Sequence, residues 1–434
     1  MFRHKGLKSV ALAIVASPLI TGACGSSDTA TDETIAEVTE ETTAVAEESK
    51  GTVKIGVLTP LTGDVAADGQ EMVDAVNLAV KRINEEGGAC GYSFEVDVRD
   101  VQYERPDAVS SAVEKLTSDP DVHFVISGYA SGTNFEIDLL AKAGMPYLIG
   151  AGSTQTRDII AKDPSKYPTI WSLAPSYDGY NTELPKVIQQ MIDEKRYVPR
   201  NKSIYVLTAD NPYSTGISEG LKENFAKIGW TVAGEEAIAT GKVEDWRIIL
   251  SKIRKADPDL IINTDYTYQN GAMFVNQFME NPTDAMLFIQ YAPQVPEFVD
   301  LTKGTSDGVL YNVLLATVPN SERAAFLKGE FKNAYGRDGG LYSVALQEGI
   351  ELYKEAVCAV DPTDHLAIGE WIGKAEMESA LGKIAFDPLT HLALQDADHM
   401  PILFYQIGAN GERVLIWPDN YKDGDFRVPP HIGK

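Results

Sequence analysis

Residues 53–91 read as a strand, a polar loop and a long helix. The run from Val53 to Leu58 is short and rich in apolar residues, as expected of a strand buried in a parallel sheet. Apolar residues then recur at helical spacing, at Met72, Val76, Ala79, Val80 and Ile83. The pattern stops at Gly87-Gly88, where glycine can adopt the left-handed conformation that ends a helix. This is half of a βαβ unit, and its loop lies at the carboxyl edge of the sheet, where open α/β folds bind ligands.

The same alternation of strand and helix continues along the chain. Strand-like runs are Phe94–Val98, Val122–Ile126, Tyr147–Ile149, Ile204–Thr208, Leu260–Asn263, Met286–Ile289 and Val309–Val313. Helical patterns between them are Pro106–Thr117, Asn134–Ala143, Tyr180–Glu194, Thr215–Ile228 and Asp245–Lys255. The alternation predicts an α/β fold with parallel sheets and right-handed crossovers. About 380 residues follow residue 50, more than one core usually holds, so we expect two Rossmann-like, doubly wound lobes.

The first 24 residues indicate export. A basic start containing Arg3 and Lys5 precedes the apolar run Val10–Ile20, which is too short to span a bilayer comfortably. Small residues then precede Cys24, an order that resembles a bacterial lipoprotein signal, although Thr21 stands where such signals usually have Leu. We therefore expect a signal peptide at 1–23 and lipidation of Cys24. The alternative is an ordinary secretory signal in which Cys24 has no role.

Residues 24–50 form an acidic segment with almost no large apolar side chains. Such a segment cannot bury enough surface to offset its ordering entropy, so we expect a disordered tether between a lipid anchor and a globular body. It contributes to the formal net charge of −25. A chain this acidic is a poor nucleic-acid binder, because phosphate binding needs clustered Lys and Arg.

One motif points weakly to catalysis. Residues 216–220 match the G-x-S-x-G pattern of hydrolases, but that chemistry needs Ser218 on a strained turn directly after a strand, whereas here it falls in the first turns of a helix. The downstream histidines lie in polar, loop-like sequence and do not follow the arrangement of a catalytic triad; they are His365, His391 and His399. The chain has no P-loop, zinc-type Cys/His spacing or dinucleotide fingerprint. We expect no catalytic residues, no cofactor and no metal.

Two loops carry hydroxyls and free backbone N–H groups at predicted helix starts. They are residues 127–133, after one strand, and 150–154, after the next. Helix N-termini favour carboxylates and other anionic or polar groups. Simple helix capping explains either loop alone, since Ser and Thr are preferred N-caps. Two such loops at neighbouring strand ends converge, which favours a binding site.

Residues 53–91 and the phrase RIILSKIRKADPDLIINTD at 247–265 resemble the type I periplasmic solute-binding proteins of ABC importers, the Leu/Ile/Val-binding group. The resemblance extends along most of 53–417. Spacing alone favours two lobes in sequence, whereas the resemblance implies two lobes exchanged through three crossover segments. It divides the chain into residues 51–173 and 310–390 for lobe one, and 174–309 and 391–434 for lobe two.

The resemblance also implies a set of ligand contacts. In lobe one, Ser131, Gly152 and Thr154 match positions that clamp a ligand carboxylate. In lobe two, Tyr213 matches an x-x-Tyr-x-x-Gly element and Tyr266 an aromatic contact. Core packing of these tyrosines is the alternative.

Two departures from the family concern charge. The family's acid for the ligand ammonium belongs after Met286–Ile289, where this chain has Gln290 and Tyr291. Asp265 is a possible replacement, or the ligand lacks a standard ammonium. Asp68 stands where the Leu/Ile/Val binders have an aromatic residue; it is either a solvated loop charge or faces a ligand cation or hydroxyl.

The implied function is that of an extracytoplasmic binding lipoprotein of an ABC transporter. It would capture a small polar solute, branched-chain-like amino acids being the first expectation, by hinge closure between two lobes. Its partners would be that ligand, a membrane permease with its ATPase, and the membrane through the lipid anchor, with no nucleic acid. The alternatives are a binder of an amide, urea or aromatic acid, and a ligand-sensing receptor of the same fold.

Cys90 and Cys358 are the remaining cysteines. Export makes a disulfide permissible, and the implied fold would put both in lobe one. The alternative is two separate, small buried residues.

Overall fold

The computed structural model describes residues 49–433, apart from 64, 103–104, 132–133 and 397. The expected signal peptide, Cys24 and all but the last two residues of the expected acidic linker lie outside the described residues. Within the described ranges, no helix has the length and apolar character needed to cross a bilayer.

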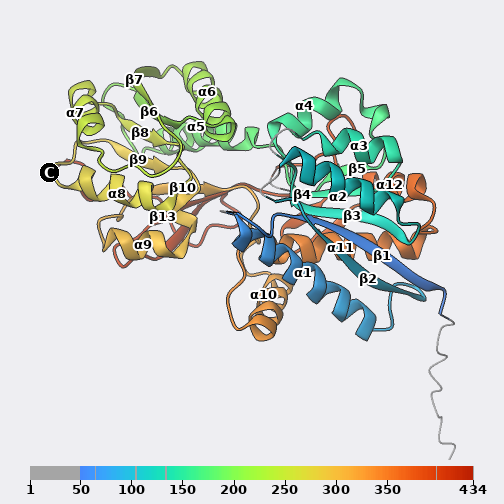
Figure 1. Ribbon diagram of the computed structural model, residues 1–434. Coiled ribbons are helices and arrows are strands. Elements are labelled where there is room, and N and C mark those ends of the chain that lie inside the picture. Colours follow the sequence, from blue (N-terminus) through green and yellow to red (C-terminus); the bar gives the residue numbers. More distant parts are fainter. Residues whose placement is uncertain (1–48, 64, 103–104, 132–133, 397, 434) are drawn as a thin grey trace, which may run out of the picture. The chain divides into compact units, whose positions relative to one another are not determined.

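The first sheet has five parallel strands in the order β2-β1-β3-β4-β5 (Figure 1). They are β1 (Gly51–Thr59), β2 (Tyr92–Asp100), β3 (Val122–Tyr129), β4 (Tyr147–Ala151) and β5 (Ile170–Ser172). One face packs on α1 (Ala66–Glu85), α10 (Glu322–Tyr335), α11 (Leu341–Ala359) and α12 (His365–Gly373). The other packs on α2 (Pro106–Ser118), α3 (Glu136–Ala143) and α4 (Thr154–Lys162), followed by the short η1 (Pro164–Lys166). Because both faces are covered, the inner strands β3 and β4 are buried along nearly their whole length, whereas the edge strand β2 carries charged residues and is only partly buried.

The second sheet has the order β14-β13-β10-β9-β8-β6-β7. Its parallel strands are β6 (Ser203–Ala209), β7 (Thr231–Ile238), β8 (Leu260–Asn263), β9 (Met286–Ile289) and β10 (Leu310–Val313). The strands β13 (Leu403–Ile407) and β14 (Arg413–Trp417) complete it in antiparallel pairing. One face packs on α5 (Asp178–Asp193) and α6 (Pro212–Lys227), the other on α7 (Arg247–Ala256), α8 (Tyr268–Met279), η2 (Ala292–Gln294) and α9 (Pro296–Thr302).

The C-terminal part of the chain returns to the first sheet before it completes the second. Helices α10 to α12 and the hairpin β11 (Met377–Ser379)–β12 (Gly382–Ile384) share a core with β1 and β3. The two lobes are therefore exchanged through crossover segments, as the family resemblance implied, and do not follow each other in sequence. Lobe one is the first sheet with its helices, and lobe two is the second sheet with its helices.

Strand pairing shifts two of the expected lobe boundaries. The expected boundary at 309/310 is too early, because β10 pairs with β9 and β13 and so belongs to lobe two. The expected boundary at 390/391 is also too early, because Leu392 bridges to Ser172 and the Ala393 amide donates to the Ser172 carbonyl. We propose lobe one as 51–173 with about 318–393, since the Val318 amide already donates to Ala380.

Local sequence explains the first helix and the loop after it. The predicted stripe of α1 is buried, and both Gly87 and Gly88 have positive φ, at 104° and 85°. The loop then brings Cys90 to the end of α11, where it forms a disulfide with Cys358 across a Cα–Cα distance of 5.2 Å. The question that the sequence left open is thus settled in favour of pairing.

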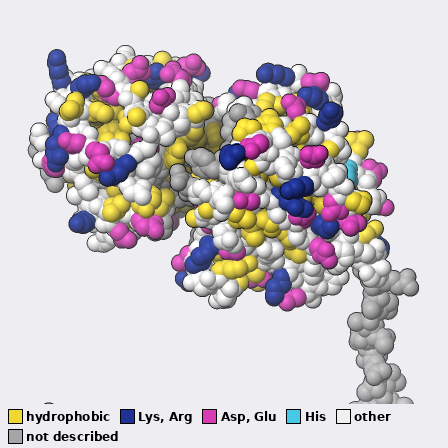
Figure 2. Space-filling model, viewed as in Figure 1, with side chains coloured by type: hydrophobic (Ala, Val, Ile, Leu, Met, Phe, Trp, Pro, Cys, Tyr) yellow, Lys and Arg dark blue, Asp and Glu magenta, His cyan; other side chains and the backbone are white. Residues whose placement is uncertain are grey.

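Charges are mixed on the surface that Figure 2 shows. On that face of the described residues, Lys and Arg side chains are interspersed with Asp and Glu and do not gather into a broad basic area.

Candidate functional site

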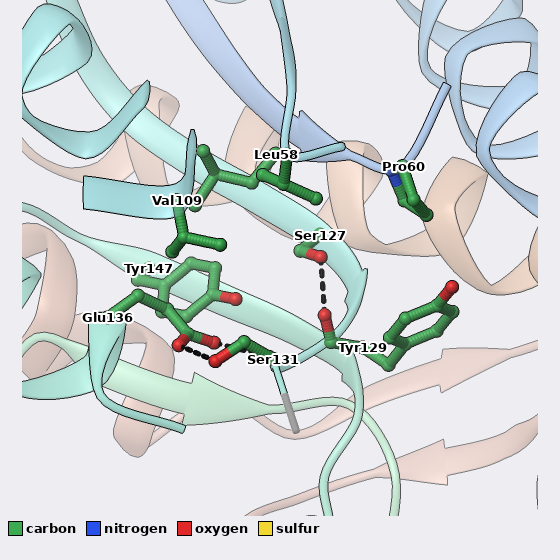
Figure 3. A pocket seen from close by; sticks show the side chains of 9 residues that line it. Leu58, Pro60, Val109, Ser127, Tyr129, Ser131, Glu136 and Tyr147 are labelled. Carbon is green, nitrogen blue, oxygen red and sulfur yellow. Dashed lines mark hydrogen bonds between the residues drawn. The ribbon is translucent and has the colours of Figure 1, made fainter. Parts of the chain in front are cut away.

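Polar groups of the loop after β3 are hydrogen-bonded to the helix that follows it. Ser131 donates both its backbone N–H and its hydroxyl to the carboxylate of Glu136 in the first turn of α3 (Figure 3). Glu136 is 1% exposed, and burial raises the pKa of its carboxyl. The ring of Tyr129 turns away from this pair. A ligand carboxylate at Ser131 stays a prediction, and it would have to compete with Glu136; Gly132 and Thr133 lie outside the described residues.

The loop after β4 leads into the N-terminus of α4. Ser153 and Thr156 form a reciprocal capping box, and Asn134 from the neighbouring loop accepts a hydrogen bond from the Thr156 hydroxyl. Gly152 is required by packing, because a Cβ there would lie 2.5 Å from the Ser172 hydroxyl. The Thr154 hydroxyl has no partner among the described residues, so it is available to a ligand.

Asp68 and Glu71 lie one turn apart at the start of α1 and have different roles. Glu71 accepts hydrogen bonds from the backbone N–H groups of Gly340, Tyr342 and Ser343, and so caps α11. Asp68 is half-buried and forms no ion pair or side-chain hydrogen bond with the described residues. Burial, and to a lesser extent the nearby Glu71, raise the pKa of Asp68 above its ordinary value.

Lobe two contributes a strained turn after β9. The Ala292 amide donates to the Gln290 carbonyl at 2.6 Å, and Tyr291 between them has φ 61° and ψ −52°. These angles define the less common type of γ-turn, in which the central residue has a positive φ. That conformation costs free energy in any residue that has a side chain. Such strain often clusters at binding sites, so Tyr291 stays a candidate ligand contact.

Several buried amides beside that turn lack partners. Gln290 is fully buried; its amide nitrogen lies 3.5 Å from the Tyr213 hydroxyl, and its oxygen has no partner in the described chain. Neither side-chain amide atom of Asn312 has a partner in the described chain, and the side-chain nitrogen of Asn263 has none either. The pairing of β10 with β9, continued by two residues, places Asn312 beside Gln290. Buried polar groups are almost always hydrogen-bonded, so the unpartnered atoms of these amides make this part of lobe two a candidate binding site.

A group of tyrosine rings leads from the buried Gln290 to Tyr266, which is exposed to solvent. Tyr213 contacts Tyr177, Tyr180 and Tyr266 with ring centroids 5.4 to 6.1 Å apart. Burial holds the pKa of Tyr213 well above its usual range, so the phenol is neutral. Tyr266 is 42% exposed, more than core packing would leave.

Asp265 supports the local fold. One carboxylate oxygen accepts from the Thr267 amide, and the other accepts from the Asn270 side chain at 2.6 Å. Both contacts fix the start of α8. In this structure Asp265 therefore holds its own helix, and a role as the replacement acid for a ligand stays a prediction.

Side chains of both lobes act on one another electrostatically around Tyr342. Burial raises the pKa of Tyr342 well above its usual range, and Tyr177, Asp68, Tyr291 and Tyr129 raise it further. Burial, followed by Asp68 and Glu71, raises the pKa of Tyr291 to about 12. Tyr129 and Tyr342 also touch, with centroids 5.6 Å apart. We call Tyr129, Tyr177, Tyr291 and Tyr342 the tyrosine cluster.

Sequence reasoning missed Tyr129, Tyr177, Tyr342 and Asn312. Asn312 had a usable signal, because a polar residue inside the apolar run Val309–Val313 requires a partner. Tyr342 had none, since only the fold brings the start of α11 next to α1.

The hydrolase-like motif does not form a nucleophile elbow. Ser218 is 1% exposed inside α6, and its hydroxyl bonds those of Thr208 and Thr264 at 2.7 and 2.9 Å. Of the downstream histidines, His365 pairs with His123, His391 stacks on Trp171 and His399 bonds Asp396. Within the described ranges, no three His, Cys, Asp or Glu side chains are grouped so as to hold a metal.

Known proteins share this sequence pattern and fold. A sequence model of the periplasmic binding protein family matches residues 52–411. The Leu/Ile/Val-binding protein BraC3 of Rhizobium johnstonii is 23% identical over 357 residues, which cover 79% of this chain and 89% of that protein. The leucine-, isoleucine-, valine-, threonine- and alanine-binding protein of Pseudomonas aeruginosa is 23% identical, with 77% and 86% coverage.

Solved structures agree in fold. A putative branched-chain amino acid ABC transporter protein from Silicibacter pomeroyi superposes with a TM-score of 0.81 at 27% identity, covering 87% of this chain and 99% of that one. The substrate-binding protein LivJ of Streptococcus pneumoniae, solved with isoleucine, has a TM-score of 0.66 at 19% identity, with 85% and 100% coverage. With two exchanged α/β lobes, polar groups at the carboxyl edges of both sheets and a family match over 52–411, this chain belongs to the periplasmic binding protein family.

Proposed function

We propose that the chain is the extracytoplasmic solute-binding component of an ABC importer. The observation that carries the proposal is a family match over residues 52–411 together with polar groups that have no partner among the described residues. These groups are the Thr154 hydroxyl and the Asp68 carboxylate in lobe one, and the Gln290 amide oxygen and both amide atoms of Asn312 in lobe two. A binding protein needs such groups, because specificity comes from a few polar contacts that only the ligand satisfies. The family that the chain belongs to consists of binding proteins, which supports a non-catalytic role.

The ligand that we propose is an amino acid or a related small polar solute. The relatives from Rhizobium johnstonii and Pseudomonas aeruginosa are described as binders of branched-chain and other small amino acids. The N-terminus of α4, with Gly152 and Thr154, suits the carboxylate end of such a ligand. Tyr213, Tyr266, Gln290 and Tyr291 would form the opposite wall.

Binding would proceed by closure of the lobes about the crossover segments, the usual response of two-lobed binding proteins. The closed form would then dock on a membrane permease whose ATPase supplies the energy. Lipidation of Cys24 after removal of residues 1–23 would keep the protein at the outer face of the cell membrane, with 24–50 as the tether.

A second candidate ligand is a neutral amide or urea. Gln290 favours it, because an amide stands where related proteins carry an acid, and its oxygen, unpartnered within the described chain, accepts an N–H donor without needing a charge.

A thermal-shift screen of amino acids, amides, ureas and aromatic acids tests the proposal, because a ligand that binds only the folded state raises the melting temperature. With the ligand found, Thr154→Ala should weaken binding about three- to a hundredfold, the value of one hydrogen bond of about 0.5–1.5 kcal/mol or somewhat more with a charged partner. Tyr266→Ala should weaken binding mainly through faster release. If no compound shifted the melting temperature, or if Thr154→Ala bound normally, the proposed site would be wrong.

A further inference from the structure

The carboxylate of Asp68 has no counterpart in the described chain. Its neighbour Glu71, one turn further along α1, has three backbone donors, whereas Asp68 has none and forms no ion pair with the described residues. A half-buried carboxylate without donors is costly unless a cation pairs with it.

The surroundings of Asp68 attract a cation and do not supply one. Glu71, one turn along α1 from Asp68, accepts a hydrogen bond from the Tyr342 amide at 2.8 Å, and the Tyr342 ring contacts that of Tyr129 at 5.6 Å. Asp68 also raises the pKa of Tyr291 and of Tyr342, in each case after burial. All these groups are acidic or phenolic. Tyrosine rings and phenol oxygens both attract positive charge, and carboxylate plus aromatic side chains is the combination that recognises organic ammonium ions.

The other charge-binding positions are weak or engaged. Lobe two has the neutral Gln290 after β9, and Asp265 is held by Thr267 and Asn270. In lobe one, both donors of Ser131 are taken by Glu136, so a ligand carboxylate has fewer anchors there. A positive group on the ligand is therefore the feature that the site is best equipped to bind.

We propose that Asp68 and the tyrosine cluster hold the positively charged group of the ligand, so that the protein selects small organic cations and zwitterions that carry a free or alkylated ammonium. This inference rests on the proposed function and names the specificity residue of that site. The ligand's positive charge would then be recognised by Asp68 in lobe one, and not after β9 in lobe two, where the family resemblance implied an acid.

Four probes separate the charge from the rest of the ligand. L-Leucine is a zwitterion, isopentylamine is the same skeleton without the carboxylate, choline is a quaternary ammonium, and N-acetyl-L-leucine lacks the positive charge. Titration calorimetry at pH 7 should show binding of at least one positively charged probe, and N-acetyl-L-leucine should bind at least tenfold more weakly. Comparison of isopentylamine with choline distinguishes N–H donation from charge alone.

The decisive variant is Asp68→Asn, with Asp107→Asn as the matched control. Asp107 also lies in the first turn of a lobe-one helix, but it is exposed and paired with Arg105. Asp68→Asn should lose at least tenfold in affinity for the charged probe, and Asp107→Asn should stay within twofold.

A second readout shows that Asp68→Asn is folded and tests the unpaired charge. Because the folded-state pKa is raised, folding is penalised at pH values above it, and the penalty disappears as the pH falls to the unfolded value. Ligand-free Asp68→Asn should therefore melt at a higher temperature than the wild type at pH 7, and the difference should vanish near pH 3.5, slightly below the ordinary aspartate pKa.

Three results would overturn the inference. They are failure of every positively charged probe to bind, unchanged affinity in Asp68→Asn, and equal binding of N-acetyl-L-leucine. If neutral or anionic compounds of the wider screen bound instead, only this inference would fail. If nothing in either set bound, the proposed function would fail with it.

Discussion

The two lobes differ in how they treat the polar groups at the carboxyl edges of their sheets. Lobe one satisfies nearly all of them internally: Glu136 binds Ser131, Ser153 and Thr156 cap α4, and Glu71 caps α11. Lobe two leaves the Gln290 amide oxygen and both amide atoms of Asn312 without partners among the described residues and holds Tyr291 in a strained turn. Lobe one is thus largely complete before the ligand arrives, except at Asp68 and the Thr154 hydroxyl, whereas lobe two holds buried amide atoms that have no partner among the described residues.

This difference suggests an order of events. A preorganised surface binds at low entropic cost, so lobe one would meet the ligand first. Unsatisfied amides and backbone strain raise the free energy of the open form of lobe two, and contact with the ligand would relieve that cost on closure. The free energy regained when the ligand contacts these groups of lobe two would then favour closure.

The largest effect should come from the disulfide, which belongs to lobe one alone. Cys90→Ser with Cys358→Ser opens a link between residues 268 positions apart and should lower the unfolding free energy by about 2–5 kcal/mol. Ligand affinity should change less than threefold, because the link lies at the far end of α1 from Asp68. Calorimetric melting of variant and wild type, the latter with and without reductant, measures this. A large loss of affinity with intact folding would show that lobe-one stiffness and binding are coupled.

Two buried glutamines in lobe two provide the next test. Gln277 is satisfied, its oxygen accepting from the Trp246 amide at 2.7 Å, whereas the oxygen of Gln290 has no partner in the described chain. Gln277→Met should lose about 1–3 kcal/mol of unfolding free energy, because it leaves a buried N–H unpaired, and Gln290→Met should be neutral or stabilising.

Urea denaturation gives both unfolding values, and ligand titration should show that only Gln290→Met weakens binding. Equal destabilisation by the two substitutions would mean that Gln290 is already satisfied and that lobe two is as complete as lobe one.

The strained turn should have a smaller effect. Tyr291→Ala and Tyr291→Gly both remove the phenol and should weaken binding equally, but glycine tolerates φ 61° and should be about 1–2 kcal/mol more stable than alanine. Lys303, with φ 48° at the end of α9, is the control: the same Gly–Ala difference in stability should appear there without loss of affinity. If alanine and glycine were equally stable at 291, the turn would store no strain.

The smallest effect concerns Ser218, which is buried inside α6 in lobe two. Ser218→Ala removes hydroxyl contacts to Thr208 and Thr264 and should cost about 0.5–1.5 kcal/mol at most. Affinity should be unchanged in the same titrations. Loss of binding in this variant while Thr154→Ala bound normally would exclude the proposed site.

The periodicity of the sequence was sufficient for the fold class and for many of the elements. Parallel strands buried on both faces are apolar runs, and helices between them carry one apolar stripe, so β1, β3, β6 and α1 were visible without a structure. Short or half-exposed elements such as β5 and β7 were not visible, since their residues carry no clear period. The exchange of lobes came from the family resemblance, and the crossing points depended on strand pairing at β10 and Leu392.

By itself, the sequence determined which loops stand at the ends of its strands, and the family resemblance then named Asp68, Thr154, Gln290 and Tyr291 as candidates within them. Only the tertiary structure decided which of them keep a free polar group. Ser131 and Asp265 have the right chemistry, but their partners, Glu136 and Asn270, engage them in the fold. Tyr342 reached the site from α11, more than 250 residues beyond Asp68 in the chain. Hydrogen-bond satisfaction depends on neighbours in space, and local sequence patterns report only neighbours along the chain.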